Sequence, residues 1–227
     1  MKIAVVIPTL DEAGQIETTL SSARGPEVEL IVVDGGSQDG TPEIAAAAGA
    51  RVIASQPGRA AQLALGARES RSEVVLFLHA DTRLPRGWSE EVANALADPG
   101  TVGGAFRFRF EREDAAKGAG FLDLVEWGAR LRSELLGLPY GDQALFVRRS
   151  VLCAIGGVPQ VPIMEDLDLV QAMKRAGQLA RLAAPVSTSA RRHRAGGPLR
   201  VSLRHLLLAL GWRLGVDRGR LAAWSRR

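Results

Sequence analysis

Cysteine is nearly absent from the chain, which contains a single one, Cys153, among its 227 residues. One thiol cannot form an internal disulfide, so the sequence lacks the cross-links typical of small exported domains and fits a reducing compartment. The N-terminus does not read as a signal peptide, because one lysine is followed by only five apolar residues before Pro8. We therefore expect a cytoplasmic protein.

Long apolar runs are also missing. Residues 199–214 form an apolar stretch near the C-terminus, but they include Arg204 and Arg213 and fall short of the roughly 20 apolar residues that span a bilayer. Arginines beside an apolar face, with Trp212 and Trp224 nearby, are typical of a helix that lies peripherally on a membrane surface, here the inner face. A helix packed on the protein's own core, or on a second subunit of a homodimer, fits the same pattern.

The remaining composition is that of an ordinary folded domain. Hydrophobic residues make up 46% of the chain and charged residues 24%, which argues against a disordered or fibrous protein. The length suits one α/β domain. The net charge is only +4, yet many arginines gather after position 181. We expect a single domain over residues 1–190, followed by a basic loop and a helical tail over residues 191–227.

Apolar strands alternate with helical segments in the first half of the chain. The pattern predicts strands over residues 2–7, 29–33, 51–54 and 74–78 and helices over residues 12–23, 41–48 and 60–69. Such alternation forms a parallel sheet, in which ligands bind beyond the carboxyl ends of the strands. This rule selects three loops as functional, at residues 8–12, 34–39 and 79–81.

The second half of the chain has fewer and longer connections. A helix is expected over residues 88–96, and residues 102–110 alternate with the period of a half-buried strand. Further elements are a helix over residues 121–136, a strand over residues 143–148 and a helix over residues 167–176. The predicted fold is α/β, with a Rossmann-like half, a mixed central sheet and C-terminal helices.

The segment IVVDGGSQDGT, residues 31–41, places Asp34 at the end of a buried strand. The glycines that follow, Gly36 among them, let a ligand approach the backbone closely. The same pattern also makes an ordinary turn in which Ser37 or Asp39 caps the next helix. By itself the segment leaves ligand binding and a simple turn both open.

Four segments together resemble the family 2 glycosyltransferases over about residues 3–175, and in chain order they read VVIPTLDE, VDGGSQDGT, HADT and MEDLDL. Within that family the chain resembles the short bacterial branch found beside radical-SAM and selenium-associated domains. The resemblance implies a GT-A fold and a nucleotide-sugar donor, and it favours a UDP-sugar. It also implies a divalent cation, Mn²⁺ or Mg²⁺. The implied acceptor is a small molecule or a lipid.

The resemblance carries donor binding over to particular residues of this chain. The nucleotide is expected to bind the first loop and the loop after the second strand. These loops contain Pro8, Thr9, Glu12, Asp34 and Gly36. Arg59, near the start of PGRAAQLALGA, is expected at the diphosphate, where a helix N-terminus also attracts anions. An exposed arginine that merely opens a helix is the alternative.

His79-Ala80-Asp81 stands where the family has its Asp-x-Asp motif, which implies donor binding by this triplet and Asp81 as the ligand of a divalent cation. Histidine replaces the first aspartate of the motif. Because Mn²⁺ tolerates imidazole better than Mg²⁺ does, the substitution leaves the identity of the cation open. We expect His79 to be a supporting or packing residue rather than a ligand.

A basic segment, RRHR at residues 191–194, precedes two glycines. In this branch such a loop is expected to fold over the diphosphate, with Arg191 and Arg192 offsetting the charge of the leaving group. His193 is a second candidate metal ligand. A solvated loop is the alternative, whereas nucleic-acid binding is not expected, because no aromatic residues are interleaved with these arginines.

Met164-Glu165-Asp166 resembles the family's Glu-Asp motif, which implies that Asp166 is the general base that removes the proton of the acceptor hydroxyl. Glu165 would steady the base or the acceptor. A pair of acids that only interacts with the dipole of its helix is the alternative. Asp142, just before a predicted strand, is expected to bond hydroxyls of the donor sugar.

These roles predict an inverting glycosyltransferase that works by a single displacement. The rivals are a noncatalytic nucleotide-sugar-binding protein and a sugar nucleotidyltransferase. The presence of both Asp81 and Asp166 disfavours the first, and the lack of a glycine-rich signature with a following lysine near the N-terminus disfavours the second. Sugar and acceptor stay open, since they depend on the pocket shape around residues 103–110 and 141–146.

Overall fold

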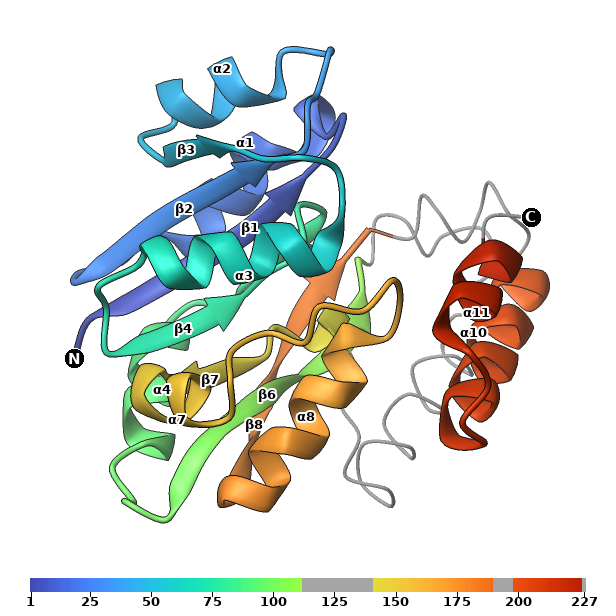
Figure 1. The fold of residues 1–227 in the computed structure, drawn as a ribbon. Helices are drawn as coiled ribbons and strands as arrows, with labels where there is room; N and C mark the ends of the chain where they lie inside the picture. Colours follow the sequence, from blue (N-terminus) through green and yellow to red (C-terminus); the bar gives the residue numbers. More distant parts are fainter. Residues whose placement is uncertain (112–140, 190–197, 226–227) are drawn as a thin grey trace.

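The computed structural model describes residues 1–111, 141–189 and 198–225. Three layers make up the described fold, with helices on both faces of a curled sheet (Figure 1). The helix expected over residues 121–136 lies outside the described residues, as does the basic segment with Arg191, Arg192 and His193.

The first half of the chain alternates strand and helix, as predicted. Its elements are β1 (Ile3–Thr9), α1 (Ala13–Ala23), β2 (Val28–Asp34), α2 (Thr41–Ala47), β3 (Arg51–Ala54), α3 (Arg59–Glu69) and β4 (Val74–Phe77). β1 pairs in parallel with β2 on one side and with β4 on the other, and β3 joins β2 in the same direction. All four strands therefore end at one edge of the sheet, called here the carboxyl edge.

The second half extends the sheet and adds the other helices of the described residues. Its elements are β5 (Thr82–Arg83), α4 (Trp88–Ala95), β6 (Thr101–Phe110), the 3-10 helix η1 (Gly141–Gln143), β7 (Phe146–Arg148), α7 (Arg149–Ala154), α8 (Glu165–Ala176), β8 (Gln178–Thr188), α10 (Pro198–Arg213) and α11 (Arg218–Ser225). The strand order is β3-β2-β1-β4-β7-β6-β8-β5. Because β7 is antiparallel to both β4 and β6, the sheet is mixed, as predicted.

Helices long and apolar enough to cross a membrane do not occur within the described ranges.

β8 is the main element that the sequence pattern does not predict. Its residues do not alternate between apolar and polar, and Pro185 lies within them. The strand forms by pairing with β6, and Pro185 falls beside a register shift in that pairing, where a missing N–H is tolerated. The strand expected over residues 143–148 is shorter than predicted, since its first residue belongs to η1 and β7 begins at Phe146.

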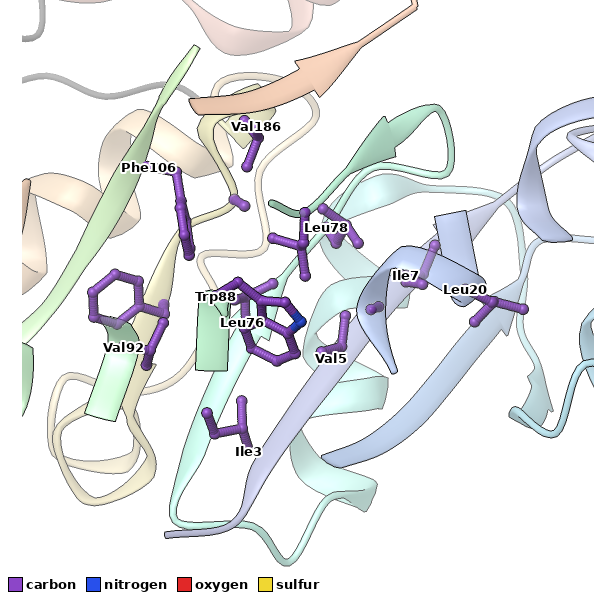
Figure 2. Packing of buried hydrophobic residues seen from close by; sticks show 14 of the residues in the cluster. Ile3, Val5, Ile7, Leu20, Leu76, Leu78, Trp88, Val92, Phe106 and Val186 are labelled. Atoms are coloured by element: carbon purple, nitrogen blue, oxygen red, sulfur yellow. The ribbon is translucent and has the colours of Figure 1, made fainter. Parts of the chain in front are cut away.

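The sheet is buried on both faces. Along β1, Val5 belongs to one buried cluster and its neighbour Val6 to the other, as the two-residue period of a strand requires. Helices α1, α2 and α4 cover the first cluster, whereas α3, α7, α8, α10 and α11 contribute to the second. Figure 2 shows part of the first cluster, to which Trp88 of α4 and Leu76 of β4 both belong. Burial of one such side chain stabilises the fold by about 1.5–3 kcal/mol.

Gly66 sets the position of α3 on the sheet. A Cβ atom at this position would collide with the side chain of Val6 and would lie 3.0 Å from that of Val33. Because glycine has no side chain, α3 packs directly on β1 and β2. The first residue of α3, Arg59, is thereby held close to the carboxyl edge.

Candidate active site

Asp34 ends β2 and organises the loop that follows. Its Oδ1 accepts hydrogen bonds from the hydroxyls of Thr9 at 2.9 Å and Ser37 at 2.5 Å, and its Oδ2 accepts from the N–H groups of Gly36 and Ser37, both at 2.9 Å. Burial raises the pKa of Asp34, but these hydrogen bonds from Ser37, Thr9 and Gly36 outweigh it and hold the pKa below its ordinary value. A carboxylate offers about four lone-pair positions, so Asp34 is saturated by its own chain.

The loops after β1 and β2 are joined by further hydrogen bonds. The N–H of Asp11 donates to Ser37 Oγ, the N–H of Ala13 to Asp39 Oδ2 and the N–H of Glu12 to Thr41 Oγ1, each at 2.9 Å. Asp39 was one of two residues that could have capped the next helix in a simple turn. Its Oδ1 accepts hydrogen bonds from the N–H and the hydroxyl of Thr41, the first residue of α2, while its Oδ2 binds the start of α1. The two loops form one unit at the carboxyl edge.

Arg59 gathers three of the predicted site residues around its guanidinium. Its Nε donates to Glu165 Oε1, its Nη2 lies 3.5 Å from Asp166 Oδ2, and its Nη1 lies 3.3 Å from His79 Nε2. Glu165 and Asp166 are only 3% and 8% exposed, so two carboxylates share a poorly solvated place. The charge of Arg59 offsets their repulsion, and Arg59 therefore does more than open its helix.

The surroundings keep Arg59 charged. Burial favours the neutral guanidinium, but the charges of Asp166, Glu165 and Asp142 prevail and raise the pKa of Arg59 above its usual value. Asp142, which lies in η1, is therefore close enough to Arg59 to belong to the same cluster of charges. A guanidinium only donates hydrogen bonds, so Nε2 of His79 is the acceptor in its contact with Arg59. The supporting role expected of His79 stays a prediction.

The third predicted loop, with Ala80 and Asp81, is fixed by elements on either side. Thr19 of α1 donates its hydroxyl to the carbonyl of Ala80 at 2.7 Å, and the N–H of Ser189 donates to the carbonyl of Asp81 at 3.0 Å. Ser189 directly follows β8. The unpredicted strand thus positions the candidate metal-binding loop.

The fit of this loop to a divalent cation depends on Asp81. In the part of the chain that the structure describes, no group of three or more His, Cys, Asp or Glu side chains is arranged to hold a metal ion. Hard cations at phosphate sites need fewer protein ligands, because one or two carboxylates act together with phosphate oxygens. Asp81 is a buried carboxylate next to the carboxyl edge and meets that need, while His193 lies outside the described residues.

Gln62 is a buried polar residue of this region that the sequence pattern did not single out. Its Nε2 donates to the carbonyl of Thr9 at 2.9 Å and to that of Val33 at 2.8 Å. Gln62 thus ties α3 to the ends of β1 and β2. The available signal was a lone amide in the otherwise apolar buried face of a helix.

Comparison with known proteins gives partial matches among curated sequences. The chain is 37% identical over 92 residues to glucosyl-3-phosphoglycerate synthase of Mycolicibacterium paratuberculosis, which covers 35% of this chain and 28% of that protein. It is 29% identical over 122 residues to glycosyltransferase AglE of Haloferax volcanii, covering 48% of this chain and 40% of AglE. The match thus spans less than half the length of either relative.

Solved structures match over nearly the whole chain. Glucosyl-3-phosphoglycerate synthase of Mycobacterium tuberculosis, crystallised with Mn²⁺, uridine diphosphate and glucosyl-3-phosphoglycerate, has a TM-score of 0.68 at 25% identity and covers 95% of this chain and 81% of its own. Mannosyl-3-phosphoglycerate synthase of Rubrobacter xylanophilus has a TM-score of 0.62 at 18% identity, with coverages of 96% and 76%. The second likeness concerns the fold alone, and both confirm the predicted GT-A architecture.

The family model described as glycosyl transferase family 2 matches residues 4–154, which is well over half of the chain. This range contains the three loops at the carboxyl edge together with Arg59. The chain therefore belongs to glycosyl transferase family 2.

Proposed function

We propose that the protein is a glycosyltransferase that moves a sugar from a UDP-sugar to an acceptor hydroxyl with the help of a divalent cation. The observation that carries this proposal is the cluster of Arg59, Glu165 and Asp166 beside the carboxyl edge of a family 2 fold. The structure of the Mycobacterium tuberculosis relative contains Mn²⁺ and uridine diphosphate. It supports the same donor chemistry here and makes Mn²⁺, rather than Mg²⁺, the first cation to test.

The nucleotide is proposed to bind the joined loops after β1 and β2, which hold Pro8, Thr9 and Glu12. Because its own chain saturates the carboxylate of Asp34, we expect Asp34 to act mainly by ordering this surface. A Cβ atom at Gly36 would meet no atom within 4 Å, so the loop leaves room for a ligand beside that glycine.

Asp81 is proposed to hold the divalent cation through its carboxylate, supported by the loop of His79 and Ala80, with His193 as a second ligand. When bound, the cation neutralises the diphosphate and makes it a better leaving group. Arg191 and Arg192 remain proposed partners of the diphosphate.

Asp166 is the proposed general base, and Glu165 steadies it. Oδ1 of Asp166 accepts from the N–H of Leu167 at 2.9 Å, whereas Oδ2 faces Arg59. A diphosphate competes with carboxylates for a guanidinium, so donor binding should draw Arg59 away from Asp166. Oδ2 can then accept the proton of the acceptor hydroxyl. Asp142, near Arg59, is proposed to bond the donor sugar.

A single displacement at the anomeric carbon inverts its configuration. An α-linked donor should therefore give a β-linked product, which proton NMR of the isolated product can identify. An α-linked product would refute inversion while leaving the transferase activity itself intact.

The acceptor is proposed to be a small hydroxylated acid, because the two glucosyl-3-phosphoglycerate synthases named above are named for a phosphoglycerate glycoside. A lipid acceptor is the alternative. Five exposed leucines, at positions 203, 206, 207, 210 and 214, follow one side of α10 and its end. They are proposed to contact an anionic membrane surface or a second subunit. Sedimentation of the protein with liposomes would indicate the membrane, whereas the molar mass of a dimer in solution would indicate the second subunit.

The assignment of residues 1–190 to the catalytic domain and of residues 191–227 to a tail is likewise a proposal. Within the described ranges, Leu208, Trp212 and Leu221 of the tail share a buried cluster with α8, which supports a tail packed on the domain. The likeness to the short bacterial branch beside radical-SAM and selenium-associated domains stays a prediction.

A thermal-shift panel tests the proposed function. Ligands that bind only the folded state raise the apparent stability, so UDP and UDP-glucose should raise the melting temperature when Mn²⁺ is present. UDP release from UDP-glucose, alone and with 3-phosphoglycerate, then tests transfer. Binding without release would favour a noncatalytic binding protein, pyrophosphate release from a nucleoside triphosphate and a sugar phosphate would favour a nucleotidyltransferase, and a response to GDP-sugars alone would contradict the uridine donor.

A further inference from the structure

The first turn of α8 carries three carboxylates, Glu165, Asp166 and Asp168. The helix dipole favours acids at an N-terminus, but three in one turn repel one another. Two arginines offset them: Arg59, the first residue of α3, binds Glu165 and Asp166, and Arg218, the first residue of α11, binds Asp168. A cation at the start of its own helix is unfavourable, so both arginines are placed by their contacts to α8.

Asp168 connects α8 with both C-terminal helices. Its Oδ1 accepts from Arg218 Nη2 at 2.8 Å and from Trp212 Nε1 at 2.8 Å, and its Oδ2 lies 3.0 Å from the same Nη2. The guanidinium carbon of Arg218 also lies 5.8 Å from the centroid of the Trp212 ring, in reach of a cation–π contact. The three side chains form one network across α8, α10 and α11.

Apolar packing also holds the two C-terminal helices, α10 and α11, together and against α8. Leu208, Trp212 and Leu221 are buried in the same cluster as Val170 of α8. A Cβ atom at Gly211 would lie 2.8 Å from Cδ2 of Leu221, so the absence of a side chain at this position lets Leu221 of α11 lie directly against α10. The pair can therefore act as a firm support for Asp168.

We propose that Asp168 is a positioning residue: through Trp212 and Arg218 it fixes the first turn of α8 and so holds Glu165 and Asp166 toward Arg59. Residues three apart lie on the same face of a helix, so Asp168 and Glu165 move together. The C-terminal helices thereby become part of the machinery for turnover. The catalytic consequence rests on the function proposed above, whereas the mechanical one does not.

Hydrogen–deuterium exchange of the full-length protein tests the mechanical part. Asp168→Asn keeps an acceptor for Trp212 but removes the charge that holds Arg218, so peptides covering residues 168–173 should exchange at least about 10-fold faster. Arg218→Lys, which keeps the charge, should lie between this variant and the wild type. Arg220→Gln, at an exposed arginine of the same helix, is the matched control and should leave exchange unchanged. Unchanged exchange in Asp168→Asn would overturn the proposal.

Steady-state release of UDP from UDP-glucose tests the catalytic part. A shift of the carboxylates should lower kcat by roughly 10- to 100-fold, with little change in KM for the donor. A role in stability alone would lower the melting temperature but leave kcat unchanged, and that outcome would also overturn the proposal. If the wild-type protein released no UDP, the proposed function would fail, while the exchange result would still decide whether Asp168 positions α8.

Discussion

Arg59 and Glu165, 106 positions apart in the chain, are the first residues of two helices and form an ion pair. The N-termini of α3 and α8 therefore meet at one point, and each contributes partial positive charge and N–H groups that attract anions. The carboxylates of Glu165 and Asp166 already use this attraction in the ligand-free protein. An incoming diphosphate would have to compete with them for Arg59.

Replacing Arg59 with glutamine should lower both stability and affinity for UDP. Two buried carboxylates would lose their counter-charge, which should reduce the free energy of unfolding by roughly 1–3 kcal/mol. Urea unfolding and a titration with UDP and Mn²⁺ measure the two effects. Arg68→Gln, at the exposed far end of the same helix, is the matched control. If the two variants had equal free energies of unfolding and equal affinities for UDP, the contacts of Arg59 to α8 would contribute to neither.

Asp166→Asn preserves the shape of the side chain but removes its ability to accept a proton. Turnover should fall at least about 10²-fold, while affinity for the donor should persist. Release of UDP measures the first and isothermal titration the second. Glu90→Gln, an exposed acid in the first turn of α4, should leave both unchanged. Near-normal turnover in Asp166→Asn would eliminate this residue as the base.

Asp81→Asn should remove the part of the thermal stabilisation by UDP that depends on Mn²⁺, because a neutral amide is a weaker ligand for a hard cation. The wild-type protein with EDTA should behave in the same way, which provides an internal comparison. A Mn²⁺-dependent shift of normal size in Asp81→Asn would place the cation elsewhere.

Asp34 should make the stability depend on pH at the acidic end. Its pKa in the folded protein lies below the ordinary value of 3.8, so its contribution is fully present above that value and is lost as the pH falls through the lowered pKa. Asp34→Asn should lose stability at pH 7 and show a smaller further loss between pH 5 and pH 2. Urea midpoints measured across this range give the comparison, and parallel curves for the two proteins would contradict the prediction.

Much of the nucleotide half could be predicted because its signals are local. Short apolar strands such as β1 and β4 are bounded by turn residues, so the sequence pattern predicts them. The rule that ligands bind beyond the carboxyl ends of parallel strands then selects Asp34 and Asp81 from the sequence alone. The predicted boundaries of these elements agree with the structure to within two residues.

The remainder depends on contacts between distant residues, which no local pattern contains. β8 becomes a strand through its pairing with β6. The partnership of Arg59 with Glu165 and Asp166 needs two helices to converge, and the sequence could say only that one residue is basic and two are acidic. For the same reason the sequence does not distinguish Asp168 from any other acid in the first turn of a helix, although Asp168 binds Trp212 and Arg218.

The reversed direction of β7 determines where sequence variation can alter specificity. A strand that runs against β4 presents its beginning, not its end, at the carboxyl edge. The residues ahead of β7, Asp142 among them, therefore reach the cluster around Arg59, whereas α7, which follows the strand, is carried to the opposite edge. Libraries aimed at a new donor sugar should accordingly diversify positions 141–145 and leave residues 149–154 untouched.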